Sequence, residues 1–504
     1  MPKLFVPFNT LNLDGAYAQT DQTGGARLTD YQEAIPGPQG TAHLRRSLSA
    51  ITTPALASKC LGATSFSLQN AADVVIAGDA TALYRAYSTV TATFTFSDIS
   101  KVGGYSTAAG ETWEFASFRQ GAEGGIQHII ATNFSDHIQD IGLRGNVSTT
   151  ATFSDLISSS TKPKARHLGI IGQFLVLGNT DQATSTTAAL TPFRVHWSAF
   201  GNPRSFTPAA ATQCDFEDLQ TGGAVQKIVG GNEYGLLIQE TQVQIMRYTG
   251  GTTIFDFSPL THVPGTPIPN SVIYYGGAVY YISTQGFIKL VGGEMSRIGN
   301  NLVDNEFWDT VDQSRFQDVT VGADPYNKMI WWGYPTDATG NAKRMFGYKI
   351  TDGRWARWVQ TIETLSLIRQ GRSSEKFIAF NTDHKLSTFT SNAPVTAIFE
   401  TNAIQPVPGR RWQCNGIRPI IDNSLVGVTP TGSVTVRVMD HPMPASTPAS
   451  LTAVSLNPDN YFPLRTAGRY QVFNVSLNPG AAVADTTSIH YLGIEIDYEI
   501  LGIR

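Results

Sequence analysis

From about residue 60 onward, the chain alternates between short apolar runs and polar or glycine-rich turns. Residues 73–78 (DVVIAG), 127–131 (QHIIA) and 167–178 (HLGIIGQFLVLG) are examples of these runs. Apolar runs of this length, bounded by turn residues, are typical of β-strands. The pattern therefore predicts paired strands through this part of the chain.

A longer pattern recurs further along, made of an apolar strand, a short turn, a second apolar strand and an aromatic residue. It occurs at residues 225–248, 272–290, 319–334 and 346–358, and we expect each segment to form one sheet. Successive units lie roughly 40 to 50 residues apart, which is the period of four-stranded propeller blades. The predicted fold class is all-β, with a β-propeller-like body of about six blades.

One hairpin in this region is specific enough to place. Gly276 and Gly277 separate residues 273–275 from residues 279–282, and residues 286–290 add a further strand. Two consecutive glycines between apolar runs are a strong signal for a tight β-turn. We expect one blade-like unit here.

Residues 300–317 (NNLVDNEFWDTVDQSRFQ) break the strand pattern. Their apolar side chains approximate a helical stripe, which consists of Leu302, Val303, Phe307, Val311 and Phe316. We predict a helix inserted between two blades. Its aromatic face, which includes Trp308, either packs against the rim of the propeller or contacts another subunit, and packing is the favoured interpretation.

The two ends of the chain differ in character from its middle. Residues 1–50 are punctuated by glycine and proline and predict an extended N-terminal arm. Residues 51–394 form the predicted propeller-like body. A proline-containing linker near residue 395 leads into residues 395–504, which we predict to be a C-terminal β-sandwich-like domain.

The last strand alternates strictly between apolar and acidic side chains. One face carries Leu492, Ile494, Ile496, Tyr498 and Ile500, and the other carries Glu495, Asp497 and Glu499. Strands that alternate in this way have one face on a core and the other on solvent. A solvated outer face is the favoured explanation of the three carboxylates, and a functional acidic stripe is the alternative.

The composition agrees with an all-β fold and limits the class of partner. Of 504 residues, 41% are hydrophobic and only 15% are charged, with 47 glycines and 26 prolines. The formal net charge is -4, so the sequence lacks the excess of Lys and Arg that tight binding of nucleic-acid phosphates requires. Contact with DNA is expected to be weak or sliding.

No arrangement of residues in the sequence predicts an active site. Cys60, Cys214 and Cys414 lie far apart, without disulfide or zinc spacing, and we expect them to be buried small hydrophobic residues. The nine histidines form no metal-like cluster, and His128 and His137 are expected to be satisfied or exposed. The common hydrolase, metallopeptidase and nucleotide-binding motifs are absent. We predict no catalytic, cofactor-binding or metal-binding residues and no enzymatic activity.

Two features leave a carbohydrate-related function open. Residues 106–113 (STAAGETW) have the spacing of the Asp-box of sialidase-like propellers, but Ala108 stands where the aspartate belongs. The pair Trp331 and Trp332 is the best candidate for a sugar-binding surface. Residues 326–334 around it have the pattern of an ordinary strand, so packing inside a blade is favoured.

The N-terminal residues do not form a targeting signal. Residues 1–10 (MPKLFVPFNT) contain two prolines and lack an apolar region with a cleavage site. No stretch reaches the roughly 18 apolar residues that a membrane-spanning helix requires. We expect no membrane-spanning segment and synthesis in the cytoplasm.

Several short segments occur together in a characteristic order. They are residues 24–31 (GGARLTDY), 194–203 (RVHWSAFGNP), 277–283 (GAVYYIS) with 285–287 (QGF), 304–308 (DNEFW), 346–348 (FGY) with 353–355 (GRW), and 493–498 (GIEIDY) with 502–504 (GIR). In these segments the chain resembles the packaged-DNA stabilisation, tail hub and tail nozzle proteins of short-tailed, podovirus-type double-stranded DNA bacteriophages. The resemblance spans nearly the whole chain, but residues 50–165 carry few matching segments.

The resemblance implies a structural virion protein made in the host cytoplasm. It implies a tail nozzle or hub subunit in a hexameric ring below the portal and adaptor proteins, retaining packaged DNA and passing it during ejection. The implied partners are further copies of the chain, the portal and adaptor, tail needle or fibre proteins and, transiently, the exiting double-stranded DNA. Glu495, Asp497 and Glu499 are the candidate channel-facing residues, since a surface with few Lys or Arg partners for phosphates lets DNA slide.

A different function remains compatible with a propeller. The alternative is a receptor-binding or polysaccharide-depolymerising tail protein built on a propeller scaffold, which the aromatic strands and the degenerate Asp-box would suit. A non-viral, lectin-like propeller is a third and weaker alternative, because the opening and closing segments resemble the phage proteins.

Overall fold

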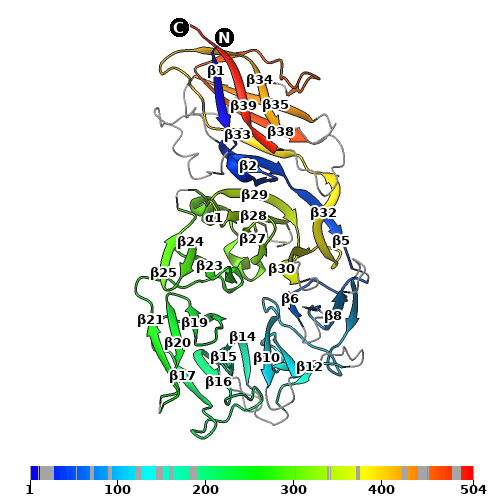
Figure 1. Cartoon of the computed structure of the whole chain (residues 1–504), viewed down its shortest axis with the longest axis vertical. Coiled ribbons are helices and arrows are strands. Elements are labelled where there is room, and N and C mark those ends of the chain that lie inside the picture. The colour runs from blue at the N-terminus through cyan, green and yellow to red at the C-terminus, as the bar shows by residue number, and fades with distance from the viewer. Residues whose placement is uncertain are drawn as a thin grey trace.

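The computed structural model describes most of the chain. The described residues are 2–8, 11, 28–52, 54–67, 73–88, 94–120, 126–143, 151–157, 163–181, 190–251, 253–300, 302–337, 340, 342–369, 375–422, 430–440, 451, 453–478 and 490–502. In these ranges the chain is built almost entirely of β-strands, which confirms the all-β class. Figure 1 shows a ring of small sheets with a second β-body at one end.

Seven four-stranded units make up the ring: six separate four-stranded sheets and the first four strands of a nine-stranded sheet. We number these blades in chain order. Blade 1 contains β6 (Gly62–Ser67), β7 (Asp73–Gly78), β8 (Leu83–Ser88) and β9 (Phe94–Asp98); blade 2 contains β10 (Glu114–Gln120), β11 (Ile126–Thr132), β12 (Gln139–Leu143) and β13 (Ser154–Asp155). Blade 3 contains β14 (Lys164–Ile171), β15 (Phe174–Asp181), β16 (Leu190–Trp197) and β17 (Asp215–Asp218).

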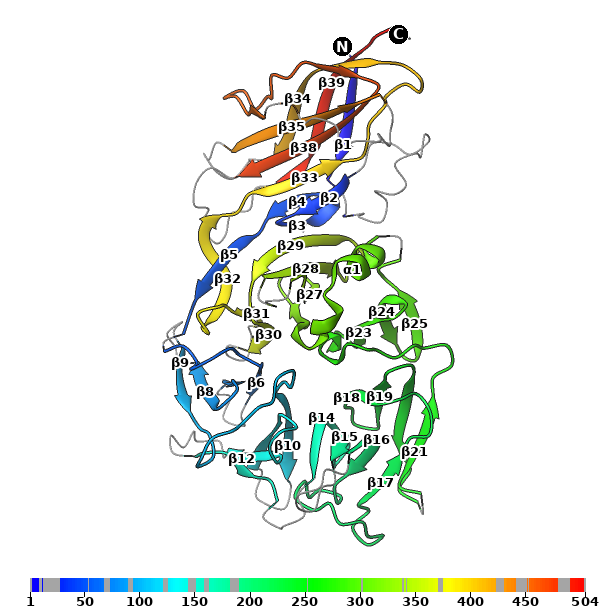
Figure 2. The same cartoon turned by 180° about the vertical axis from the view of Figure 1, so that it is seen from behind.

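The remaining blades complete the circle (Figure 2). Blade 4 contains β18 (Val225–Val229), β19 (Tyr234–Gln239), β20 (Val243–Tyr248) and β21 (Phe255–Pro259); blade 5 contains β22 (Ile273–Tyr275), β23 (Ala278–Ser283), β24 (Gly286–Val291) and β25 (Glu294–Arg297). Blade 6 contains β26 (Thr320–Asp324), β27 (Met329–Pro335), β28 (Ala342–Lys349) and β29 (Trp355–Thr361); blade 7 contains β30 (Thr364–Arg369), β31 (Glu375–Phe380), β32 (Leu386–Pro394) and β5 (Arg46–Ala50).

The apolar runs of the sequence form the second strands of the blades. In β19, Leu237 packs in a cluster shared with blade 3, whereas the next residue, Ile238, packs in a cluster shared with blade 5. Consecutive residues of a strand point to opposite faces, so a strand that lies between two neighbouring blades must be apolar at both. This explains why these runs are continuous rather than alternating.

The ring has one blade more than the roughly six expected from the spacing of the repeats. Residues 319–334 and 346–358, which we expected to form two sheets, are the two halves of blade 6. Residues 51–165, where few segments are recognisable, hold blades 1 and 2. Sequence spacing does not show whether two neighbouring strand pairs belong to one sheet, because that depends on pairing between them.

Two local predictions can be compared directly with the structure. The hairpin is confirmed: Gly276 and Gly277 join β22 to β23 and have φ angles of 60° and 83°, as a type I′ turn requires. The helix is shorter than predicted, because it consists of α1 (Asp304–Thr310) followed by the 3-10 turn η5 (Gln313–Asp318). Val311 leaves the helical path with an extended backbone, and Asp312 caps η5 by accepting a hydrogen bond from the Ser314 backbone N–H at 3.0 Å.

The helix lies between blades 5 and 6, as predicted for an insertion. Trp308 contacts the rings of Phe307 and Phe316, with centroids 5.1 and 6.1 Å apart, and is partly buried against the main hydrophobic core. Within one chain, its aromatic face therefore packs on the propeller.

The second β-body is a sandwich of two sheets. The first contains β3 (Ala34–Pro36), β4 (Ala42–Leu44), β39 (His490–Ile500), β34 (Trp412–Asp422) and β37 (Thr466–Gly468), and β1 (Lys3–Pro7) also pairs with β39. The second contains β2 (Leu28–Gln32), β33 (Ala397–Thr401), β38 (Tyr470–Asn478), β35 (Thr431–Met439) and β36 (Val454–Ser455). The described part of the N-terminal segment thus supplies four sandwich strands and, through β5, the outer strand of blade 7. Gly24, Gly25, Ala26 and Arg27 lie outside the described residues.

The sandwich and the ring share one continuous sheet. Strand β2 lies between β33 of the sandwich and β29 of blade 6, with Gln32 opposite Arg357 in a parallel pairing. Behind it, Arg45 forms a buried ion pair with Glu33 and lies 5.1 Å from the centre of the Trp358 ring. Because backbone pairing, a buried ion pair and one hydrophobic cluster all cross this junction, the two bodies are held together as a single unit.

Candidate functional site

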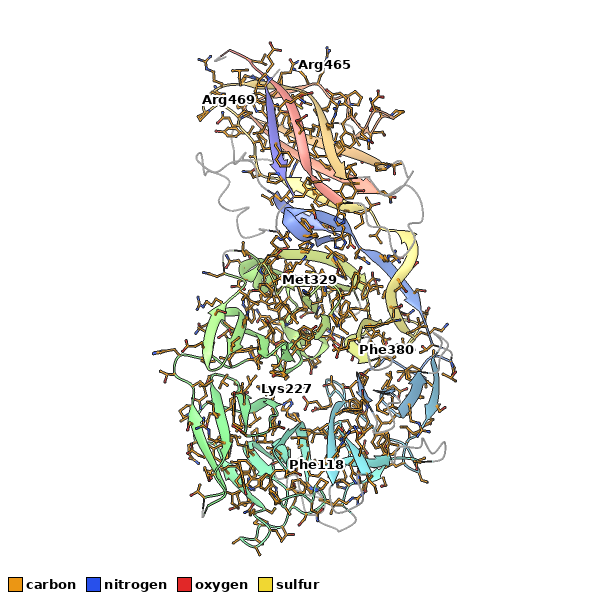
Figure 3. All side chains as sticks on the ribbon, viewed as in Figure 1. Phe118, Lys227, Met329, Phe380, Arg465 and Arg469 are labelled. Carbon is orange, nitrogen blue, oxygen red and sulfur yellow. The ribbon has the colours of Figure 1, made fainter. Side chains whose placement is uncertain are left out.

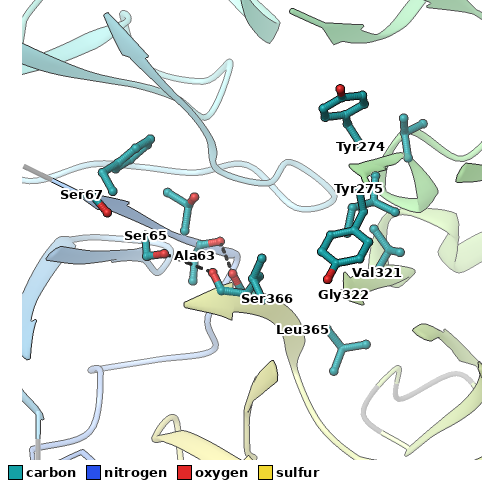
Figure 4. A pocket seen from close by; sticks show the side chains of 14 residues that line it. Ala63, Ser65, Ser67, Tyr274, Tyr275, Val321, Gly322, Leu365 and Ser366 are labelled. Carbon is teal, nitrogen blue, oxygen red and sulfur yellow. Dashed lines mark hydrogen bonds between the residues drawn. The ribbon is translucent and has the colours of Figure 1, made fainter. Parts of the chain in front are cut away.

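A cavity lies on the axis of the ring. It has a volume of about 570 Å³ and is lined by the innermost strands of blades 1, 5, 6 and 7. These strands, β6, β22, β26 and β30, are each the end strand of their sheet, so their inner edges carry no further strand in the described part of the chain. Figure 4 shows Ser65, Ser67 and Ser366 on one side of the cavity, facing Tyr274 and Tyr275 on the other.

The cavity is lined by hydroxyl, aromatic and aliphatic side chains. Its residues are Ala63, Thr64, Ser65, Phe66, Ser67, Val272, Ile273, Tyr274, Tyr275, Val321, Gly322, Leu365, Ser366 and Leu367, and none of these carries a charge at neutral pH. The Ser366 hydroxyl donates to the Ala63 carbonyl at 3.0 Å and the Ser65 hydroxyl to the Leu367 carbonyl at 3.3 Å. These two bonds fix blade 7 against blade 1.

One end of the axis is covered by two segments that meet across it. Gly110 precedes blade 2 and Gln317 precedes blade 6, yet a Cβ atom at Gly110 would lie 3.9 Å from the Gln317 side chain. The Asn270 amide also donates to the Gln317 carbonyl at 3.0 Å. Ser67 and Tyr275 end their strands and therefore lie toward the opposite end. The cavity is thus a pocket with its mouth on the side of the Tyr275 turn.

A buried ion cluster joins the other innermost strands. The Glu114 carboxylate of β10 accepts a hydrogen bond from the Leu168 backbone N–H at 2.8 Å and lies 3.2 Å from His167 Nδ1. Lys227 of β18, labelled near the ring centre in Figure 3, donates to the same carboxylate. Burial acts to raise the pKa of Glu114, but Lys227 and His167 outweigh it and lower the pKa to about 2. Such a carboxylate is a poor base, and its effect is to tie blades 2, 3 and 4 together.

A second cluster lies at the covered end of the axis. Asp318 accepts a hydrogen bond from Lys59 at 2.6 Å, and its carbonyl oxygen accepts one from Lys343. Lys343 is fully buried, and burial, assisted by the positive charge of Lys59, lowers its pKa to about 7. Glu363 accepts from the Cys60 backbone N–H at 2.8 Å and lies 2.5 Å from His384 Nδ1. Each carboxylate is already engaged in contacts between blades 1, 6 and 7.

The candidate acidic residues lie on the sandwich, away from the axial cavity. Glu495 forms an ion pair with Lys3 at 2.6 Å, and Arg418 stands opposite it on β34. Asp497 is partly buried and Glu499 is exposed. The outer face of β39 is therefore of mixed charge in one chain, and its relation to a channel between subunits stays a prediction.

The tryptophan pair is not a sugar-binding surface. Trp331 and Trp332 are fully buried, which confirms the favoured packing interpretation. Trp331 stacks on Trp358 with ring centroids 3.7 Å apart, and the Trp332 indole donates to the Ser271 carbonyl at 2.9 Å. In the Asp-box-like segment, Trp113 is buried and its indole donates to the Asp79 carbonyl at 2.8 Å. That segment is a turn between blades 1 and 2.

The cysteines and the first of the two singled-out histidines are packed as predicted. Cys60, Cys214 and Cys414 are buried free thiols, and burial raises the pKa of each. His128 is buried with Nδ1 2.9 Å from Asp140, which also accepts from Arg204 at 2.6 Å. In the described ranges no group of three or more His, Cys, Asp or Glu side chains is placed to hold a metal ion.

Sequence reasoning identified the hairpin at Gly276 but not the adjacent tyrosines as cavity residues. The signal was the pair of tyrosines directly before a double-glycine turn, in a strand of only three residues. A short strand with exposed aromatics is unusual inside a sheet. Assigning it to the axis, however, requires knowing which strand of the blade is innermost.

None of the helices in the described residues is long and apolar enough to cross a bilayer.

Comparisons with known proteins identify no family. No protein-family model matches the sequence, and no curated protein matches it significantly. Similar solved structures include PorZ, a surface component of the type-IX secretion system of Porphyromonas gingivalis (TM-score 0.36, 8% identity, 71% of this chain and 43% of that one). Others are BBS1N in complex with ARL6DN (TM-score 0.37, 10% identity, 72% and 98%) and the WD40 domain of Neurospora crassa Pan2 (TM-score 0.38, 8% identity, 69% and 98%). The propeller assignment rests on the strand topology itself.

Proposed function

We propose that this chain is a non-enzymatic structural subunit of a short-tailed phage tail, forming the nozzle or hub below the portal and adaptor. The proposal rests on the ordered segments that resemble that family. The observation in the fold that carries it furthest is the rigid union of propeller and sandwich, which share a sheet, a buried ion pair and a hydrophobic core. An elongated unit without an internal hinge suits the wall of a tube that withstands packaged DNA.

DNA would pass between subunits, not through the propeller. The axial cavity is small and covered at one end by the contact between Gly110 and Gln317. A duplex whose major groove alone is about 12 Å wide does not fit such a space. A hexameric ring, with the channel on its symmetry axis, is therefore part of the proposal.

Blade 3 offers apolar side chains for contacts between subunits. Leu190, Phe193, Phe200 and Phe216 are 61%, 43%, 53% and 38% exposed. All four belong to β16, β17 or the turn between them. Exposed apolar side chains along β16 and β17 offer contact points on both faces of the blade, and neighbouring copies, the adaptor or a tail fibre are the proposed partners.

Cryo-electron microscopy of the purified chain mixed with the portal and adaptor of its parent virus tests the proposal. A ring with an axial channel docked below the adaptor is the expected result, and it would show directly whether Glu495, Asp497 and Glu499 face the lumen. A chain that stays unbound, or attaches at the periphery as a spike, rules out the nozzle function and favours the receptor-binding alternative. Hydrolysis of a host polysaccharide by the purified chain would rule out the non-enzymatic part.

A further inference from the structure

The axial cavity has the form of a ligand site. Its volume of about 570 Å³ falls within the range of small-molecule pockets, which is roughly 300 to 1,000 Å³. The segment around Gln317 lies at one end of the axis, and a ligand enters from the other, where Ser67 and Tyr275 end their strands. Tyr274 is 61% exposed at this mouth, so its ring is accessible to a ligand.

The chemistry of the lining selects the class of ligand. Every hydrogen-bonding side chain in it is a hydroxyl, from Ser, Thr or Tyr, and a hydroxyl can both donate and accept. The inner edges of β6, β22, β26 and β30 add backbone N–H and C=O groups, and a carbonyl that already accepts from a serine, such as that of Ala63, keeps a second lone pair. Such a lining matches a polyol, whose own hydroxyls also donate and accept.

Charged ligands do not fit this lining. It offers no cation to a phosphate, sulfate or carboxylate, and no carboxylate to an amine. An anionic sugar or a nucleotide would therefore lose its hydration without gaining a counter-charge.

We propose that the axial cavity binds a neutral saccharide, with the Tyr274 ring stacked on the apolar face of a sugar ring at the mouth. Deeper in the pocket, the serine and threonine hydroxyls and the strand edges of blades 1 and 7 bind the sugar hydroxyls. Tyr275, which ends β22 and lines the cavity beside Tyr274, contributes its phenol hydroxyl. This site is independent of the nozzle role and would hold in either a nozzle or a peripheral tail protein.

The test is binding of neutral and charged oligosaccharides to the purified full-length chain on a glycan array, followed by titration calorimetry of the neutral ones. We expect at least one neutral oligosaccharide to bind. Tyr274→Ala should weaken it about tenfold or more, as the loss of an aromatic anchor does. Tyr326→Ala is the matched control, because Tyr326 is 89% exposed on the neighbouring blade 6 and lies outside the cavity lining; its affinity should equal that of the wild type.

A second variant separates the ring from the hydroxyl. Tyr275→Phe keeps the aromatic ring and removes one hydrogen-bonding group, so it should weaken the same saccharide severalfold while leaving the melting temperature unchanged. The proposal is overturned if no neutral saccharide binds, if only charged sugars bind, or if Tyr274→Ala binds like Tyr326→Ala. Each of these results leaves the position of the chain in the virion unaffected, so the two proposals fail separately.

Discussion

Blade 6 and blades 2 to 4 are parts of one ring, and buried apolar side chains join each of them to its neighbours, but their most distinctive contacts differ. Blade 6 carries four fully buried tryptophans on β27 and β29, which reach blade 5, blade 7 and the sandwich. Blades 2, 3 and 4 are joined at the axis by the Glu114, His167 and Lys227 cluster. We call these the aromatic seam and the ionic seam.

The difference follows from what each seam has to join. Blade 6 contacts three bodies at once, and apolar burial stabilises contacts in all directions without requiring one geometry. At the axis the innermost strands of blades 2, 3 and 4 converge, and a directed ion pair fixes the spacing of the strands. The aromatic seam should therefore depend on side-chain volume, and the ionic seam on pH.

The largest effect is expected from Trp331→Ala in the aromatic seam. Trp331 stacks on Trp358 and lies directly over Gly347, where a Cβ atom would be only 2.5 Å from its ring. The substitution leaves a cavity in place of the indole, and the surrounding side chains can relax into it only partly. We therefore expect the free energy of unfolding to fall by about 3–5 kcal/mol. Denaturant unfolding followed by circular dichroism measures it.

Tyr326→Ala, on the same blade but exposed, should stay within about 0.5 kcal/mol of the wild type. A loss below about 1 kcal/mol for Trp331→Ala would show that the seam repacks freely, and would contradict its role as the junction of three bodies.

In the ionic seam, Glu114→Gln should cost about 2–4 kcal/mol, because it leaves the partly buried Lys227 beside a neutral group. The pKa of Glu114 is lowered to about 2 from an ordinary 4.5, so the folded state binds its proton less readily than the unfolded state. The stabilisation is complete above pH 4.5 and is lost as pH falls toward 2. The difference between wild type and variant should shrink across that window in thermal melts.

Glu111→Gln provides the comparison for an exposed ion pair. Glu111 binds Arg166 at 2.7 Å, but the Arg166 side chain is 40% exposed. Its loss should cost less than about 1 kcal/mol. Equal effects at Glu111 and Glu114 would mean that burial at the axis does not strengthen the cluster.

Among the three seam and buried-amine substitutions, and apart from the exposed controls, the smallest effect is expected at Lys343, a buried amine on blade 6. Its pKa is lowered to about 7 from 10.5, so between these values the unfolded state binds more protons and stability rises with pH. Lys343→Met should remove that rise and stabilise the protein at pH 7 by about 1–2 kcal/mol. Lys376→Met, at an exposed position of β31, should keep the rise; a slope that persists in Lys343→Met would contradict the assignment.

The sequence predicted elements whose pattern is local. The alternation of β39 and the double glycine after β22 depend only on neighbouring residues, and both strands are present. On the apolar face of β39, Ile494 and Ile496 are buried while Leu492 remains 37% exposed. Local pattern thus placed the strand correctly and its end less well.

The contacts that make the sites are not local, and the sequence did not predict them. Glu114 meets His167 and Lys227 from positions 53 and 113 residues away, and each of these residues taken alone has the pattern of a surface charge. The axial cavity needs four blades in place before Tyr274 and Ser366 face one another. Such sites are properties of the closed ring.

The pairing of β5 with blade 7 sets the order in which the protein can be completed. Thr52 and Leu386, joined by a hydrogen bond at this closure, are 334 positions apart. At a synthesis rate of roughly 5–20 residues per second, β32 is made some tens of seconds after β5. The interval between the synthesis of β1 and that of β39 is longer still. Only chains synthesised through β39 carry a complete sandwich. An assembly that docks through the sandwich would therefore exclude truncated chains.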